Sequence, residues 1–145
     1  VLMDFGATYD GWHSDMTRTV CVGKPSDKMK SVYETVLTAQ LSALDAVKAG
    51  MSGKALDKIA RDIITEAGYG DNFGHSLGHG VGVEIHESPY ASPSREDILP
   101  ENSIVTVEPG IYLEGKFGVR IEDFVVVTEN GCINMTKAPK ELICL

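Results

Sequence analysis

The stretch from Gly74 to Glu87 concentrates the side chains most able to do chemistry. It holds three of the four histidines of the chain, separated by glycines. His75 and His79 would share one face of a helix, as in zinc proteases, but each glycine costs a helix about 1 kcal/mol relative to alanine. The residues after His86 and Glu87 also exclude a His-Glu-x-x-His motif. We therefore expect a glycine-rich loop that feeds a short strand, where the backbone approaches a ligand closely; the local alternative is that the histidines satisfy hydrogen bonds in turns.

Several acidic side chains interrupt segments whose composition otherwise favours β-strands. They are Asp4, Asp15, Glu108 and Glu122. An ionised carboxylate is not buried without a partner, so such groups are paired or bind metal. Only Arg18 and Arg120 lie in the same segments, and two guanidinium groups cannot neutralise four acids. We expect Arg120 to orient Glu122, since the two residues alternate onto one face. Each acid alone could be an exposed strand residue, but together with the histidines they favour a metal site.

The predicted donors are mostly oxygen atoms with one or two imidazoles. Such a set suits Mn²⁺, with Zn²⁺ and Co²⁺ as alternatives. Four acids and a histidine are too many for one tetrahedral zinc ion. They fit two divalent ions about 3.5–4 Å apart, between which a bridging water becomes a nucleophile.

A β-hairpin must position two of these acids. Asp10-Gly11 is a strong signal for a two-residue turn, which pairs Asp4 with Thr17 across the two strands. Asp15 then lies on the same face as Asp4 and diagonal to it, at about 7–8 Å between backbones. Two carboxylates that converge in this way should repel each other unless a positive group lies between them.

The rest of the chain predicts a scaffold of the α+β class. Apolar residues recur at helical spacing from Asp27 to Ala49 and again after Ser52, with Ser26 and Ser52 as N-caps and Gly50 and Gly68 as stops. We expect no chemistry on these helices. Strands are predicted at residues 104–107, 111–113 and 118–128, a short edge strand at 132–135, and an irregular connection at 88–100.

Length and composition narrow the class of protein. A chain of 145 residues suits a single domain, which we place at residues 1–145. The net charge of −8 argues against a nucleic-acid surface, and no apolar run is long enough to span a membrane. Three scattered cysteines favour a reducing compartment, which we take to be the cytoplasm. The chain opens inside an apparent strand without a starting methionine, so we expect an N-terminal portion to be missing.

These motifs, in this order, resemble those of the "pita-bread" metallopeptidases, a family that includes methionine aminopeptidase, aminopeptidase P and prolidase. The matching segments are Asp4-Phe5-Gly6, Ser14-Asp15-Met16-Thr17-Arg18-Thr19, His75-x-x-x-His79 with His86-Glu87, Glu108-Pro109-Gly110 and Arg120-Ile121-Glu122-Asp123. Glu108-Pro109-Gly110-Ile111-Tyr112 and the histidine pair resemble the Xaa-Pro branch. The resemblance implies a curved antiparallel sheet with outer helices, of which this chain is the C-terminal portion of the catalytic domain, and a homodimer for the full-length protein.

The resemblance also implies a role for each site residue. Asp4 and Asp15 would hold one ion, Asp15 and Glu122 would bridge both, and His79 and Glu108 would complete the second. Glu108 would also shuttle a proton.

Four further positions match the substrate side of the family's site. His86 would hydrogen-bond the scissile carbonyl, and His75 would line the proline side of the cleft. Tyr112 and Arg120 match supporting positions near the substrate.

Three functions follow from this resemblance. The leading one is a metal-dependent exopeptidase that cleaves proline-containing peptides before the proline. The second is removal of methionine, which Glu108-Pro109-Gly110 disfavours, and the third is a catalytically inactive peptide-binding module. Metal stoichiometry and the hydrolysis of Ala-Pro against Met-Ala peptides would separate them.

Overall fold

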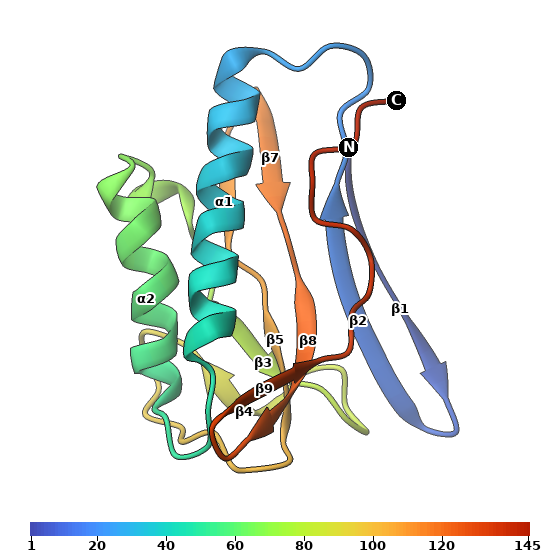
Figure 1. The fold of residues 1–145 in the computed structure, drawn as a ribbon, viewed down its shortest axis with the longest axis vertical. Helices are drawn as coiled ribbons and strands as arrows, with labels where there is room; N and C mark the ends of the chain where they lie inside the picture. The colour runs from blue at the N-terminus through green and yellow to red at the C-terminus, as the bar shows by residue number, and fades with distance from the viewer.

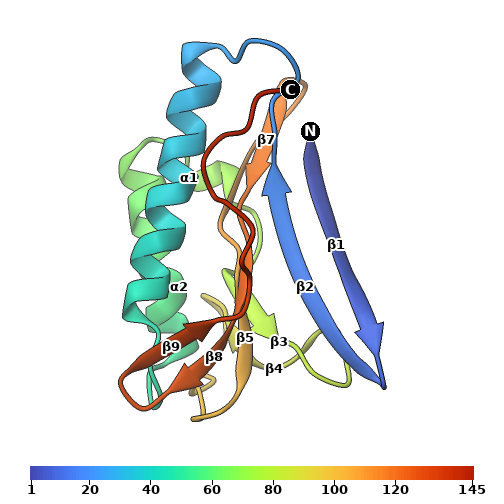
Figure 2. The ribbon, with the colours of Figure 1, turned by 45° about the vertical axis from the view of Figure 1, so that its right-hand side comes forward.

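A pair of helices and a long hairpin flank the remaining strands on different sides (Figures 1 and 2). The computed structural model describes all residues, from Val1 to Leu145. The elements in chain order are β1 (Leu2–Tyr9), β2 (Trp12–Thr19), α1 (Asp27–Ala46), α2 (Gly53–Glu66), the 3₁₀ turn η1 (Gly70–Asn72), β3 (Gly78–Gly80), β4 (Glu87–Ala91), β5 (Ile104–Val107), β6 (Gly110–Leu113), β7 (Phe117–Arg120), β8 (Asp123–Thr128) and β9 (Gly131–Asn134). The fold is α+β, as predicted.

The hairpin of β1 and β2 has the predicted register. Asp10 and Gly11 have φ values of 49° and 81°, the positive values that a two-residue hairpin turn requires. Asp4 pairs with Thr17, and Gly6 pairs with Asp15. The turn chemistry of two residues therefore fixes which face of the hairpin carries the acids.

Both predicted helices form, with small differences at their ends. The Ser26 side chain caps α1 by accepting a hydrogen bond from the Met29 amide at 3.2 Å. Helix α1 ends at Ala46 instead of Ala49, because the backbone leaves the helical conformation at Val47, whose ψ is 125°. Ser52 precedes α2 but makes no side-chain cap bond. Neither helix combines the length and the apolar character that a membrane crossing needs.

The strands form two further antiparallel sheets. One is five-stranded in the order β4-β3-β5-β8-β9, and the other is the hairpin of β6 and β7. The predicted strand 118–128 is interrupted at Ile121 and Glu122, because the Glu122 amide leaves the sheet and donates to the Thr17 carbonyl of β2 at 3.0 Å. The prediction of an irregular segment at 88–100 was wrong at its start, where β4 pairs with β3.

The hydrophobic core lies between the helices and the strands. It includes Val32 and Val36 from α1, Leu56 and Ile64 from α2, and Val105 and Val125 from the five-stranded sheet, all inaccessible to solvent. Two polar side chains on the helices, Gln40 and Asp57, are also buried.

Candidate metal centre

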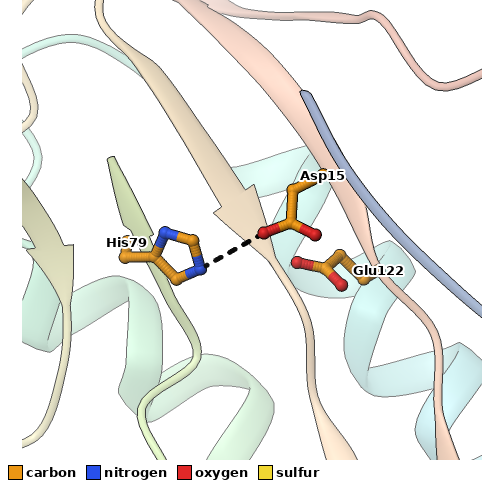
Figure 3. Close-up of side chains that lie close together, drawn as sticks. All are labelled: Asp15, His79 and Glu122. Atoms are coloured by element: carbon orange, nitrogen blue, oxygen red, sulfur yellow. Dashed lines mark ion pairs between the residues drawn. The ribbon is translucent and has the colours of Figure 1, made fainter. Parts of the chain in front are cut away.

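Three side chains from separate elements converge beside the hairpin (Figure 3). Asp15 comes from β2, His79 from β3, and Glu122 from the break between β7 and β8. One donor atom from each lies within 4.8 Å of the others, and His79 Nε2 is 3.8 Å from Asp15 Oδ2. This is the spacing of groups that can share one small cation.

The backbone of β3 directs His79 toward the acids. Its amide donates to Thr106 Oγ1 at 3.0 Å, and its ring Nδ1 lies 3.0 Å from the Gly80 carbonyl. A Cβ on Gly78 would lie 2.0 Å from the Thr106 carbonyl oxygen, and one on Gly80 2.6 Å from that of Ser88. Gly78 and Gly80 thus let the neighbouring strands approach β3 closely.

Glu122 is the most deeply buried acid of the group, with its side chain 2% exposed. Its carboxylate accepts a hydrogen bond from Thr17 Oγ1, which also accepts one from Arg120 Nε at 3.0 Å. Burial first, and then repulsion from Glu108 and Asp15, raise the pKa of Glu122 to about 8. At neutral pH and without a cation nearby, the Glu122 carboxyl is therefore mostly protonated and uncharged.

Glu108 extends the cluster on the side of His79. Its Oε1 lies 3.1 Å from His79 Nε2 and accepts a hydrogen bond from Thr106 Oγ1 at 3.0 Å. Burial alone would lower the pKa of His79, but the hydrogen bonds to Glu108 and to the Gly80 carbonyl raise it above its ordinary value. The pKa of Asp15 is raised by burial and by repulsion from Asp4.

Asp4 stands apart from this group. Its carboxylate pairs with the guanidinium of Arg120 and is 51% exposed, although it shares a cavity wall with Asp15. Arg120 Nε lies 4.0 Å from Glu122 Oε2, too far for the hydrogen bond that the sequence predicted, and it reaches that carboxylate through Thr17. The positive group beside Asp4 is thus the guanidinium of Arg120.

The remaining predicted residues flank the cluster on two sides. The ring of His86 packs edge-on against that of His79, with centroids 4.2 Å apart. His75 Nε2 lies 2.8 Å from the Tyr112 hydroxyl, which accepts a hydrogen bond from Arg120 Nη1 at 3.2 Å. The structure therefore brings these side chains to the borders of the same site.

Sequence analysis missed His13. It lines a cavity of about 400 Å³ together with Asp4, Asp15 and His86. Its amide donates to the Gly82 carbonyl at 2.9 Å, and its ring Nδ1 lies 3.2 Å from the same oxygen. The sequence contained a signal for His13, because residues two apart in a strand share a face and the predicted register puts His13 on the same face as Asp15.

The donor set fits divalent cations. Buried carboxylates with raised pKa values face one another and an imidazole, and the only guanidinium close to them is Arg120. Such a cluster is costly without more positive charge, which a metal ion supplies. Carboxylate oxygens with one imidazole suit hard to borderline ions and do not select one metal.

Comparison with known proteins identifies the family. Residues 1–129 match the model of metallopeptidase family M24. The chain belongs to this family. The match covers the hairpin, both helices and β3 to β8.

Named relatives place the chain in the Xaa-Pro branch. It is 54% identical over 143 residues to the Xaa-Pro dipeptidase of Pyrococcus furiosus, covering 99% of this chain and 41% of that protein. It superposes on the X-Pro aminopeptidase of Thermotoga maritima with a TM-score of 0.96 and 53% identity, covering 99% of this chain and 40% of that one. The corresponding values for the Xaa-Pro dipeptidase of Bacillus anthracis are 0.97, 53%, 99% and 41%. The chain thus spans about 40% of the length of the relatives it matches.

Proposed function

We propose that the protein is a metal-dependent exopeptidase that hydrolyses the peptide bond before proline. The observation that carries this proposal is the convergence of Asp15, His79 and Glu122, with Glu108 3.1 Å from His79. The family supports it, because the relatives named above are Xaa-Pro dipeptidases and an X-Pro aminopeptidase. The substrate is a proline-containing peptide.

Two divalent ions, with Mn²⁺ as the first choice and Co²⁺ or Zn²⁺ as alternatives, would be held by five side chains: Asp4, Asp15, His79, Glu108 and Glu122. When bound, such ions polarise a carbonyl and lower the pKa of a shared water. Asp4 would exchange part of its ion pair with Arg120 for this role. Arg120 would remain beside the site as the group that balances its charge.

Glu108 is the group we assign to proton transfer. It lies at the edge of the cluster with its side chain 13% exposed, so a substrate can reach it more readily than the buried Glu122. It would take a proton from the attacking water and hand it to the leaving nitrogen of proline.

The histidines and Tyr112 would act on the substrate. His86, beside His79, would donate a hydrogen bond to the carbonyl oxygen as negative charge develops there. His75 would line the proline side of the cleft, with Tyr112 and Arg120 as its supports.

We further propose that residues 1–145 form the C-terminal portion of the catalytic domain, that the full-length protein is a homodimer, and that it works in the cytoplasm. The last point rests on the free cysteines Cys21, Cys132 and Cys144, which are typical of a reducing compartment. We expect the choice between dipeptidase and aminopeptidase activity to depend on the residues that close the cleft on the N-terminal side of the substrate.

The test removes metal from the full-length protein, titrates it with Mn²⁺ by calorimetry, and assays Ala-Pro and Met-Ala peptides. We expect two ions per chain and hydrolysis of the Ala-Pro peptides. Glu108→Ala should bind metal more weakly and lose about 10²–10⁴-fold in turnover, the usual contribution of a positioned general acid and base. Glu114→Ala, at the exposed turn between β6 and β7, is the control.

Two results would contradict the proposal. Near-normal hydrolysis by Glu108→Ala would remove that residue from the reaction. A folded protein that binds no Mn²⁺ would instead favour the inactive peptide-binding module.

A further inference from the structure

Helix α2, where no chemistry was predicted, carries an ion pair between the buried Asp57 and Arg61, whose side chain is 25% exposed. Asp57 has a side chain 1% exposed, and Arg61 one turn later grips both of its oxygens, with Nε–Oδ2 at 2.6 Å and Nη2–Oδ1 at 2.9 Å. Lys58 and Asp62 form an ion pair with the same spacing on the same helix, but both are more than half exposed. The carboxylate of the first pair is thus buried and its guanidinium is partly covered, whereas the second pair is an ordinary surface contact.

Asp57 and Arg61 make their other hydrogen bonds to the backbone of residues 73–77. Asp57 Oδ1 accepts from the Leu77 amide at 2.9 Å, while Arg61 donates to the carbonyls of Phe73 and His75 at 2.9 and 2.8 Å. Residues 73–77 belong to no helix or strand, and other backbone groups hold them only at their two ends, where Phe73 donates to the Gly70 carbonyl and Leu77 accepts from the Glu108 amide. The side chains of α2 supply the hydrogen bonds that a sheet would otherwise provide.

The segment held in this way presents His75. The guanidinium of Arg61 lies 4.2 Å from the centre of the Phe73 ring, whose edge meets the His75 ring with centroids 5.0 Å apart. On its other side His75 Nε2 lies 2.8 Å from the Tyr112 hydroxyl. The imidazole is therefore fixed between one ring positioned by α2 and one hydroxyl at the border of the metal centre.

We propose that Asp57 and Arg61 are positioning residues that set the orientation of His75, and through it the binding of the proline side of the substrate. Neither side chain reaches the cleft, and both act through the backbone of residues 73–77. A planar guanidinium can grip a carboxylate with two bonds and still donate to two carbonyls, whereas a lysine ammonium cannot reproduce this geometry. This inference rests on the proposed function of His75.

The test measures Xaa-Pro hydrolysis by the full-length, metal-loaded protein with Arg61→Lys, Asp57→Asn and, as the matched control, Lys58→Ala. We expect Arg61→Lys and Asp57→Asn to lower kcat/KM by about 10- to 100-fold, as small displacements of a substrate-binding group do. Mn²⁺ stoichiometry should stay at the wild-type value, since the metal ligands are not touched. Lys58→Ala should keep wild-type kinetics.

A double-mutant cycle separates positioning from simple stabilisation. If Arg61 acts through His75, then Arg61→Lys should cost little further activity in a His75→Ala background, while the thermal midpoint falls equally in both backgrounds. Equal losses of activity in both backgrounds would overturn the inference. Should the α2 variants fail to fold, Phe73→Leu removes the ring contact alone and enters the same cycle.

An independent readout needs no activity. The imidazole nitrogens of the metal-free full-length protein can be observed by NMR with ¹⁵N-labelled histidine, and the signals that disappear in His75→Ala assign those of His75. The signal of His75 Nε2, bonded to Tyr112, should shift in Arg61→Lys and not in Lys58→Ala. An unchanged signal would overturn the inference, whether or not the protein hydrolyses Xaa-Pro peptides. A lack of Xaa-Pro hydrolysis by itself would refute only the proposed function.

Discussion

Glu122 and Asp123 are adjacent in the chain and equally hidden from solvent, yet their surroundings are opposite. Glu122 faces Asp15 and Glu108, and burial together with these acids raises its pKa to about 8. Burial alone would raise the pKa of Asp123 as well, but hydrogen bonds from Lys140, Arg18 and Asn134 hold it below its ordinary value. The difference lies in the partners and not in the depth of burial.

The partners of Asp123 come from distant parts of the chain. Its oxygens accept from Arg18 on β2 at 2.7 Å, Gln40 on α1 at 3.0 Å, Asn134 on β9 at 2.6 Å and Lys140 in the C-terminal tail at 2.5 Å. Asp123 therefore links β8 to β2, α1, β9 and the C-terminal tail, and its negative charge is balanced by Arg18 and Lys140. Glu122 accepts a hydrogen bond from the Thr17 hydroxyl and faces Asp15 and Glu108, and its nearest cationic group, Arg120 Nε, is 4.0 Å away. A buried carboxylate whose neighbours are arginine and lysine side chains is a structural group. A buried carboxylate whose neighbours are other acids is a candidate metal ligand.

Removal of the Asp123 carboxylate should cause the largest loss of stability. Asp123→Ala leaves Arg18 and Lys140 without their carboxylate, and removing one partner of a buried pair costs about 3–5 kcal/mol of unfolding free energy. Urea unfolding of the protein measures this loss. Glu96→Ala, which breaks a surface pair with Lys54, should cost less than about 1 kcal/mol. Equal costs would mean that the Asp123 network contributes no more than a surface contact.

A second prediction concerns the pH dependence that Glu122 gives to the metal-free protein. Its pKa is raised from 4.5 to about 8, so between these values the folded state holds a proton that the unfolded state has released. The unfolding free energy should therefore fall as pH rises from about 4.5 to about 8, by a few kcal/mol at about 1.4 kcal/mol per pKa unit. Denaturant unfolding across this range measures the slope.

Glu122→Gln is the matched variant for this slope, because it keeps the shape of the protonated side chain. The difference in stability between wild type and variant isolates Glu122 from other titrating groups, and a difference that stays constant with pH would contradict the assignment. Saturating Mn²⁺ should stabilise the wild type most at the alkaline end, since it binds the ionised carboxylates of the folded state.

The smallest effect is expected for Lys140→Met. Its ammonium is 20% exposed and is one of several donors to Asp123, so we expect a loss of about 1–2 kcal/mol at neutral pH. The lowered pKa of Asp123 stabilises the fold above its ordinary value of 3.8, and this stabilisation is lost as pH falls through the folded-state pKa. The stability gap between wild type and Lys140→Met should therefore narrow on acidification. A gap that widened in acid would contradict the role of Lys140.

Several features could be predicted from the sequence because they depend on neighbouring residues. The turn at Asp10-Gly11 determined the pairing of Asp4 with Thr17, and the cap at Ser26 determined the start of α1. The motifs in their order predicted the family, and Glu108-Pro109-Gly110-Ile111-Tyr112 with the histidine pair predicted its Xaa-Pro branch. The candidate ligands were found as acids placed where apolar residues belong.

Only the tertiary structure decided which of these acids meet and what surrounds them. Asp15 and Glu122 converge with His79, whereas Asp4 pairs with Arg120. The surroundings of Asp57 and Asp123 depend on segments 20 to 105 residues away, such as the Arg18 side chain beside Asp123. A periodic pattern shows which residues share a face, because that follows from local backbone geometry. It does not show whether a buried carboxylate will face a cationic or an acidic side chain from another element. That difference distinguishes a structural carboxylate from a candidate metal ligand.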